Sequence, residues 1–264
     1  MPTIHPIEAV LFTAILGLIV GSFLSMLTWR WPRMLHLNAS EQFRHLSFSR
    51  SACPSCHATL PWYRLIPLIS WIWSRGQCHH CHTTISRRYP IIEFVTALLS
   101  AALVYHAGVN WLALYGLIFL WILLAIAIID IEHQLILDAL SLPLLWLGLI
   151  LNTQHVFTTP EQAILGAATG YLILWAIFQT FKWLTGKEGM GYGDFKLLAA
   201  LGAWFGALAI PQIILIASIS SLMIGLALVL LKRRSFDSPL PFGPFLALGG
   251  WVSLMFGSEL IQQL

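Results

Sequence analysis

Long apolar runs separated by short polar stretches dominate this chain, and most runs approach the length at which a helix crosses a bilayer. We expect a transmembrane helix at each of eight runs: Ile7–Trp29, Pro90–His106, Trp111–Ile129, Leu135–Leu151, Ile164–Trp183, Phe195–Ile210, Gln212–Leu231 and Phe242–Leu260. Some runs are short, so they must tilt little or the bilayer must adapt to them. The first run is too long for the apolar core of a cleavable signal, and we expect it to be retained as a span. The pattern predicts an all-α polytopic membrane protein with about eight transmembrane helices.

The composition excludes an ordinary soluble domain. Of 264 residues, 58% are hydrophobic and only 9% are charged, and the mean hydropathy is +0.79. Many of the 12 tryptophans stand near the ends of the predicted spans, where an interfacial aromatic belt places them.

The distribution of basic residues predicts the orientation. All 14 Lys and Arg residues fall in three connections, at 30–90, 182–196 and 232–234. If all eight runs cross the membrane, these three connections lie on the same side of it. An odd number of spans would instead distribute the basic residues over both sides. The positive-inside rule places that side in the cytoplasm and both termini outside.

The segment 30–89 is long enough to form a small cytoplasmic domain, and it carries two Cys-x-x-Cys pairs. Twenty-one residues lie between Cys56 and Cys78, and four thiolates can close a tetrahedral structural zinc site. We expect Zn²⁺ to be bound by Cys53, Cys56, Cys78 and Cys81. Two disulfides and four unrelated cysteines are the alternatives, the first disfavoured in a reducing compartment. Nearby His57, His79, His80 and His82 are interpreted as solvated loop residues that could replace a ligand.

The predicted organisation is therefore a first transmembrane helix at 1–29, a zinc-knuckle domain at 30–89 and a seven-helix membrane domain at 90–264. Between the two cysteine pairs, the run from Trp62 to Trp73 is too short and too interrupted by proline to span. We expect it to lie at the membrane interface.

Two acids stand at the edges of predicted spans. Asp194 follows the glycine-rich turn Gly189-Met190-Gly191-Tyr192-Gly193 and leads into an apolar helix, and Asp130 ends the run Trp111–Ile129. An N-cap role explains Asp194 equally well when it is taken alone. In the predicted topology, however, both acids fall at the cytoplasmic face, where they can meet.

Two neighbouring carboxylates tend to share a proton, so one can activate water while the other protonates a carbonyl oxygen. This favours a peptidase over an ion- or proton-coupled transporter, whose acids lie near the midplane of repeated, broken helices. Asp138 is an alternative partner, and Glu93, inside a predicted span, needs a function or a partner. Gly17 and Gly21 form a G-x-x-x-G pair that we interpret as close helix packing.

The chain also resembles a known family through an ordered set of motifs that covers nearly its whole length. The set is Gly21-Ser22-Phe23-Leu24, Arg30-Trp31-Pro32, the two cysteine pairs, Arg88-Tyr89-Pro90 with Glu93, Asp130 with Asp138, Gly191-Tyr192-Gly193-Asp194-Phe195-Lys196, and Pro241-Phe242-Gly243-Pro244-Phe245. In this order the motifs are similar to those of the type IV prepilin peptidases, which are aspartic proteases of the GxGD class.

The resemblance implies a bifunctional enzyme of the bacterial inner membrane. It would cut the basic leader from type IV prepilins or type II secretion pseudopilins on the cytoplasmic side, and then methylate the new N-terminus with S-adenosylmethionine. Membrane lipid is an implied partner and nucleic acid is not, and the oligomeric state stays open. The resemblance makes Asp130 and Asp194 catalytic. Gly191, Gly193, Lys196 and Asp138 are implied to support them, and Gly21, Gly76, Arg88 and Glu93 to bind the methyl donor.

The chain departs from the family pattern at three places. Ser25 and Trp31 stand where the family often has Asn and Leu, in a region tied to methylation. Leu137 stands where a proline is common, which changes the entry to the fourth predicted helix and leaves Asp130 and Asp138 in place.

Overall fold

Helices make up nearly all the regular structure of this chain. A computed structural model describes residues 6–187, 189–232 and 240–261. Within these ranges the extended pairings are two isolated bridges, Ala52 with Thr59 and Gln77 with Thr84. Arg233 and Arg234, two of the basic residues of the connection at 232–234, lie outside the described residues.

Each of the eight predicted runs contains a helix. These are α1 (Pro6–Arg30), α4 (Arg88–Ala107), α5 (Trp111–His133), α6 (Asp138–Asn152), α7 (Pro160–Thr185), α8 (Tyr192–Phe205), α9 (Ile210–Leu230) and α10 (Gly243–Ile261). Short helices α2 (Ala39–Phe48) and α3 (Ile69–Trp73) and the 3₁₀ turns η1 (Trp31–Met34), η2 (Trp62–Leu65) and η3 (Ala207–Ala209) lie between them. The all-helical fold class is confirmed.

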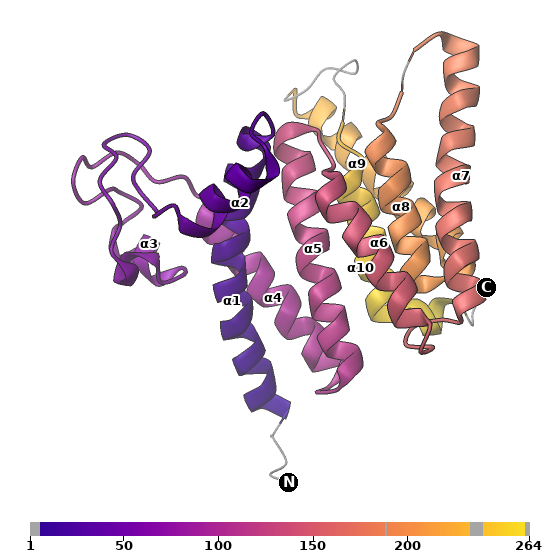
Figure 1. Cartoon of the computed structure of the whole chain (residues 1–264), viewed down its shortest axis with the longest axis horizontal. Coiled ribbons are helices and arrows are strands. Elements are labelled where there is room, and N and C mark those ends of the chain that lie inside the picture. The colour runs from indigo at the N-terminus through magenta and orange to yellow at the C-terminus, as the bar shows by residue number, and fades with distance from the viewer. Residues whose placement is uncertain (1–5, 188, 233–239, 262–264) are drawn as a thin grey trace. The chain divides into compact units, whose positions relative to one another are not determined.

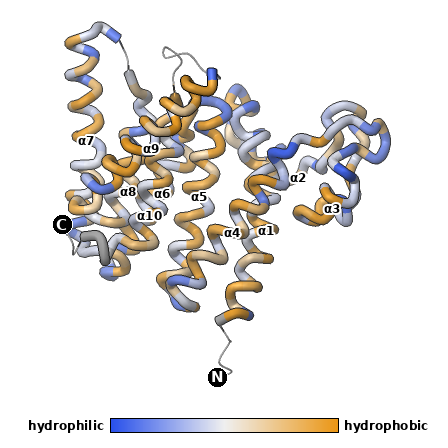
Figure 2. The backbone as a smooth tube through the Cα atoms, turned by 180° about the vertical axis from the view of Figure 1, so that it is seen from behind, coloured by the Kyte–Doolittle hydropathy of each residue, from blue (hydrophilic) through white to orange (hydrophobic). Residues whose placement is uncertain are grey.

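Among the described residues, five helices are long and apolar enough to cross a membrane, namely α1, α4, α5, α7 and α9, and α6 and α10 are shorter apolar helices. Figure 2 shows the helices as largely hydrophobic along their lengths, with hydrophilic residues gathered at many of the connections. The count of eight crossings stays a prediction.

Three predicted boundaries were wrong by a turn or more. Helix α7 begins at Pro160 instead of Ile164. Helix α8 ends at Phe205 instead of continuing to Ile210, because Gly206 takes a φ of 85° and its N–H bonds back to Gly202. Helix α5 continues past Ile129 to His133. Asp130 therefore lies inside the last turn of a helix rather than beyond it.

The chain divides into two compact units, Met1–Trp121 and Ile122–Leu264, with the division inside α5. In the first unit, α1 and α4 pack directly on each other (Figure 1). A Cβ at Gly17 would lie 2.7 Å from the Cα of Ala97, and a Cβ at Gly21 would lie 2.7 Å from the Cα of Glu93. The two glycines let the helix backbones touch, which confirms the packing interpretation of this pair.

In the second unit, α8 is the central helix. From Phe195 to Phe205 every residue apart from Lys196 is apolar or glycine, and the segment Leu197–Trp204 is buried throughout. A helix that is apolar on all sides is stable only when neighbours surround it. The neighbours that pack against α8 include α6, α7 and α10.

Glycines and one buried amide hold the neighbours of α8 in place. A Cβ at Gly166 of α7 would stand 2.2 Å from the carbonyl oxygen of Gly202, so these two helices cross in backbone contact. The Asn152 side chain at the end of α6 donates to the carbonyls of Ala203 and Trp204 and accepts from two backbone N–H groups. These bonds satisfy the C-terminal end of α8 and fix the orientation of the helix that carries Asp194.

Candidate functional site

Asp194 lies in the first turn of α8 with 7% of its surface exposed. Gly191 is the N-cap of this helix, and its backbone hydrogen bonds to the Asp194 carboxyl. The other carboxyl oxygen, Oδ1, is buried and has no hydrogen-bond partner among the described residues. The capping interaction therefore uses one side of the carboxyl and leaves the other available for chemistry.

Asp130 lies in the last turn of α5 and is 5% exposed. Its Oδ2 accepts a hydrogen bond of 2.9 Å from the backbone N–H of Gly243, the first residue of α10. This bond joins the ends of two helices that are far apart in the sequence.

Ile136 connects the surroundings of the two acids. A Cβ built on Gly193 would lie 2.7 Å from the Cβ of Ile136, and one built on Gly243 would lie 3.1 Å from its Cδ1. The Asp130 carboxylate is close enough to act electrostatically on Asp194. The second unit thus brings together the two acids that the sequence placed at one membrane face.

Asp138 takes a different position. Both of its carboxylate oxygens lie 2.7 Å from the Lys196 Nζ, and the Asp138 and Lys196 side chains are 55% and 31% exposed respectively. This ion pair ties the first turn of α6 to the second turn of α8. Asp138 is therefore engaged with a cation, while the charge of Asp130 acts on Asp194.

Aromatic rings surround the residue after Asp194. Phe195 makes edge contacts with Tyr171 and Phe178 of α7 and with Tyr192, at centroid distances of 5.8, 5.6 and 5.4 Å. Such pairs stabilise a fixed arrangement of rings by about 0.5–1.5 kcal/mol each. They hold the first turn of α8 against α7.

The four cysteines form one cluster in the first unit. Their sulfur atoms all lie within 4.8 Å of one another, with Cys53 to Cys81 at 3.7 Å and Cys56 to Cys78 at 4.0 Å. A tetrahedron of thiolates at about 2.3 Å from a zinc ion has edges of about 3.8 Å. All four are free thiols, so the disulfide alternative is not the arrangement of this structure.

Local hydrogen bonds make two of these sulfurs better metal ligands. Backbone N–H groups of Cys56 and Ser55 lower the pKa of the Cys53 thiol to about 6, and the Thr83 hydroxyl at 2.6 Å lowers the pKa of Cys81. Both effects favour the thiolate, which is the form that binds metal. At Cys56 the Ala58 backbone bond lowers the thiol pKa, but burial and the neighbouring cysteines outweigh it and raise that pKa to about 11. The cluster fits a closed four-sulfur metal site.

Glu93 has a partner in the same unit. Its Oε2 accepts a 2.8 Å hydrogen bond from the backbone N–H of Leu68, and the Ser22 hydroxyl also bonds to it. Leu68 has a φ of 58°, a conformation that is costly for leucine. Glu93 thus attaches the start of α3 to the α1–α4 pair.

The other residues implied to bind the methyl donor also have structural contacts. Arg88 donates to the carbonyl of Ser25 and to the hydroxyl of Thr28, both at 2.6 Å. Gly76 has a φ of 66° and lies against the Trp71 ring, and Gly21 lies against Glu93. None of these four residues lines the cavity between α1 and α2.

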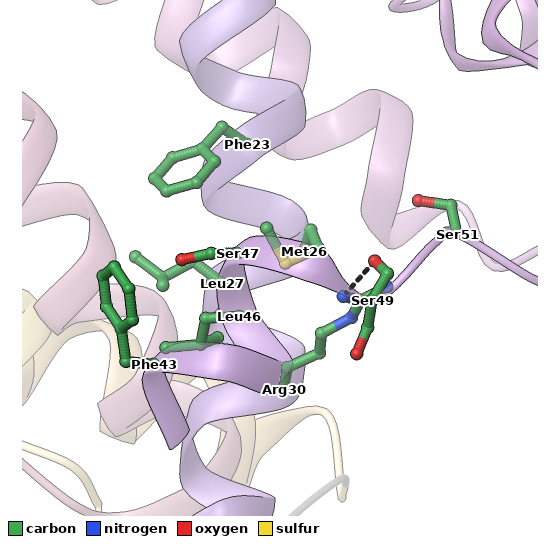
Figure 3. Close-up of a pocket in the computed structure, with 9 residues that line it drawn as sticks. All are labelled: Phe23, Met26, Leu27, Arg30, Phe43, Leu46, Ser47, Ser49 and Ser51. Atoms are coloured by element: carbon green, nitrogen blue, oxygen red, sulfur yellow. Dashed lines mark hydrogen bonds between the residues drawn. The ribbon is translucent and has the colours of Figure 1, made fainter. Parts of the chain in front are cut away.

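A cavity of about 440 Å³ opens between the end of α1 and α2. Its walls are Phe23, Met26, Leu27, Arg30, Phe43, Leu46, Ser47, Ser49 and Ser51. Figure 3 shows the rings of Phe23 and Phe43 on the side away from the hydrogen bond between Arg30 and Ser49. Arg30 donates to the carbonyls of His45, Ser49 and Arg50, so its guanidinium secures the C-terminal end of α2.

Comparison with known proteins accounts for both units. The bacterial peptidase A24 N-terminal domain matches residues 15–107, and the type IV leader peptidase family matches residues 117–226. A protein of Pseudomonas aeruginosa named prepilin leader peptidase/N-methyltransferase is 44% identical, over 98% of this chain and 94% of the relative. The chain belongs to the type IV leader peptidase family.

Other members of the family are similar over comparable lengths and carry the same name. The Aeromonas hydrophila protein is 42% identical over 93% of this chain and 90% of its own. The Burkholderia pseudomallei protein of strain 1026b is 42% identical over 94% of this chain and 85% of its own length. No solved structure matches this chain. These findings support the peptidase interpretation and give the transporter alternative no support.

Sequence reasoning missed three residues of these two sites. Gly243 was noted only as part of a motif, Ile136 was assigned nothing, and Leu68 was treated as part of an interfacial run. Gly243 and Leu68 act through their backbone N–H groups and Ile136 through van der Waals contact, so the identity of the residue does not indicate the role. The Pro-Phe-Gly-Pro pattern around Gly243 was the one available signal, because the proline after Gly243 and the glycine itself mark the start of a helix.

Proposed function

We propose that this chain cuts the leader peptide from prepilins and methylates the N-terminus that cleavage exposes. The observation that carries the peptidase assignment is the pair of buried carboxyls, Asp130 and Asp194, which lie in one unit close enough for the charge of Asp130 to act on Asp194. Membership of the type IV leader peptidase family and the shared name of its relatives support the combination of the two activities.

The proposed hydrolysis uses Asp130 and Asp194 as an acid–base pair. One carboxylate takes a proton from water as its oxygen attacks the scissile carbonyl carbon, and the other carboxyl donates its proton to the carbonyl oxygen. The tetrahedral intermediate then collapses, the C–N bond breaks and the leaving amine is protonated. Gly191 and Gly193 support the reaction by letting the turn approach closely, and the Lys196–Asp138 pair supports it by anchoring α8.

The four-cysteine cluster would hold a structural Zn²⁺. Its sulfur spacing and the lowered pKa of the Cys53 and Cys81 thiols support this role. A closed site with four protein ligands has no open position for water, so zinc here would stabilise the knuckle segment rather than take part in hydrolysis.

S-adenosylmethionine would supply the methyl group for the second activity. Gly21, Gly76, Arg88 and Glu93 were expected to bind it, but their contacts are with the polypeptide itself. These contacts fit a supporting role in the unit that matches the A24 N-terminal domain.

The proposed orientation places the basic connections and both catalytic acids on the cytoplasmic side of the bacterial inner membrane, with the termini outside. A prepilin has a basic leader before an apolar helix, so its cleavage point would lie at the membrane interface beside the acids. We keep 30–89 as the proposed knuckle domain and 90–264 as the proposed peptidase domain. The run Trp62–Trp73, with Trp62 and Trp73 78% and 84% exposed, would contact lipid headgroups.

The assignment predicts that Asp130→Asn and Asp194→Asn each lower prepilin cleavage by about 10²–10⁴-fold, since each removes one proton-transfer group. The test is co-expression with a prepilin, followed by intact-mass analysis, which separates loss of the leader from gain of a methyl group. Glu161→Gln, which changes an exposed acid in the first turn of α7, is the matched control. Full processing by either aspartate variant would remove the pair from the mechanism.

A further inference from the structure

The Asp130 carboxylate accepts a hydrogen bond from the N-terminal end of α10, a helix that carries neither of the two catalytic aspartates. Gly243 is the first residue of α10, and its N–H is one of the helix-end donors that have no partner within the helix. That N–H points to Asp130 Oδ2 at 2.9 Å, in a buried position. The positive end of the α10 dipole therefore faces Asp130 and favours its charged form.

A side chain at residue 243 would displace the carboxylate that accepts this bond. An added Cβ would lie 2.6 Å from Asp130 Oδ2 and 3.1 Å from Ile136 Cδ1. The first distance is shorter than any real contact of this type, so a side chain here would push the Asp130 carboxylate away. The next residue is Pro244, which has no N–H, so it cannot replace the lost donor.

The two acids are therefore in different surroundings. Each carboxyl accepts one backbone bond at a helix N-terminus, Asp130 from Gly243 and Asp194 from Gly191, but Asp194 Oδ1 is in addition buried with no partner among the described residues. An ionised oxygen without a partner is costly inside a protein, and a protonated one is much less so. The nearby cation, Lys196, is committed to Asp138.

We infer that the Gly243 amide is a positioning group that holds Asp130 as the ionised base and leaves the shared proton on Asp194, the acid. The inference rests on the proposed peptidase function. In this assignment water gives its proton to Asp130 as the C–O bond forms, and Asp194 gives its proton to the carbonyl oxygen. When the C–N bond breaks, the amine takes the proton from Asp130 and Asp194 is reprotonated by the collapsing hydroxyl.

The direct test is Gly243→Ala against Gly257→Ala, a matched change in the same helix. A Cβ at Gly257 meets its nearest neighbour, the Ser253 Cβ, at an ordinary 3.9 Å. In purified enzyme we expect Gly243→Ala to lower the kcat of prepilin cleavage by about 10²-fold with KM unchanged, since a shift of about 1 Å in a catalytic group costs that much. Methylation of an already cleaved pilin should be retained, which shows that the variant is folded.

Cleavage by Gly243→Ala within about twofold of Gly257→Ala would overturn the positioning role, because a change of 1 Å in a catalytic group costs far more than that. A wild-type enzyme that cuts no prepilin would instead overturn the proposed function, so the two failures are distinguishable.

A second measurement does not depend on the Gly243 variant. Infrared spectra of enzyme labelled with ¹³C-carboxyl aspartate report a protonated carboxyl through its C=O stretch. We expect the wild type to show this band at neutral pH and Asp194→Asn to lose it, because Asp130 alone stays ionised. A band that persists in Asp194→Asn would place the proton on Asp130 and overturn the assignment of acid and base.

Discussion

At the scale of single residues, three aspartates show how environment separates side chains of one type. Asp130 and Asp194 are buried and the charge of Asp130 acts on Asp194, whereas Asp138 is more than half exposed and bonded to Lys196. Sequence reasoning left Asp138 open as an alternative catalytic acid, because it follows Asp130 by eight residues. The ion pair with Lys196 argues for a supporting role.

Asp138→Asn should therefore impair the enzyme only mildly. An exposed ion pair contributes about 0–1 kcal/mol, so the loss of stability should stay in that range and cleavage should fall by less than about tenfold. The initial rate of prepilin cleavage and the melting temperature, measured beside Asp130→Asn, check this. Complete loss of cleavage by Asp138→Asn in a folded enzyme would make Asp138 the first catalytic acid.

At the scale of elements, one hydrogen bond attaches the Trp62–Trp73 region to the α1–α4 pair. Glu93 of α4 accepts from the Leu68 N–H at the start of α3 and so holds Leu68 at a φ of 58°. A strained backbone of this kind costs about 1–3 kcal/mol and persists only where its surroundings impose it. The contact gives the buried Glu93 the partner that the sequence required.

Glu93→Ala should release this attachment, whereas Glu93→Gln, which keeps an oxygen acceptor, should largely preserve it. We expect amide hydrogen exchange over residues 66–73 to be faster by about tenfold or more in Glu93→Ala, because loss of a bond to a charged group costs about 1.5–3 kcal/mol. Exchange in α8 serves as the internal control. Equal exchange over residues 66–73 in wild type and Glu93→Ala would show that the bond holds nothing in place.

At the scale of the whole molecule, the two units divide the chemistry. The four cysteines, Glu93 and Arg88 lie in Met1–Trp121, and the two catalytic candidates with Gly243 lie in Ile122–Leu264. The matched families divide at nearly the same place, with one ending at residue 107 and the other beginning at 117. Damage to one unit should therefore affect one activity more than the other.

Removal of metal tests this division. We expect purified protein to contain about one Zn²⁺ per chain, and Cys78→Ser to lose it, since a four-thiolate site needs every ligand. Methylation should fall with the metal while prepilin cleavage continues, as measured by intact mass with metal content determined in parallel. Protein that has no metal and keeps both activities in chelator would contradict the zinc site.

The sequence by itself determined the helical fold class, the positions of the helices and the residue types of both sites. Apolar runs, paired cysteines and isolated acids are local patterns, and local physics places each on a helix or in a turn. Only the tertiary structure decided that Asp130, and not Asp138, lies near Asp194, and that Gly243 donates to Asp130. It also decided that Glu93 bonds to Leu68 and that α8 ends at Phe205. These features depend on backbone groups and on contacts between distant segments, and backbone groups are the same in every residue until packing brings two of them together.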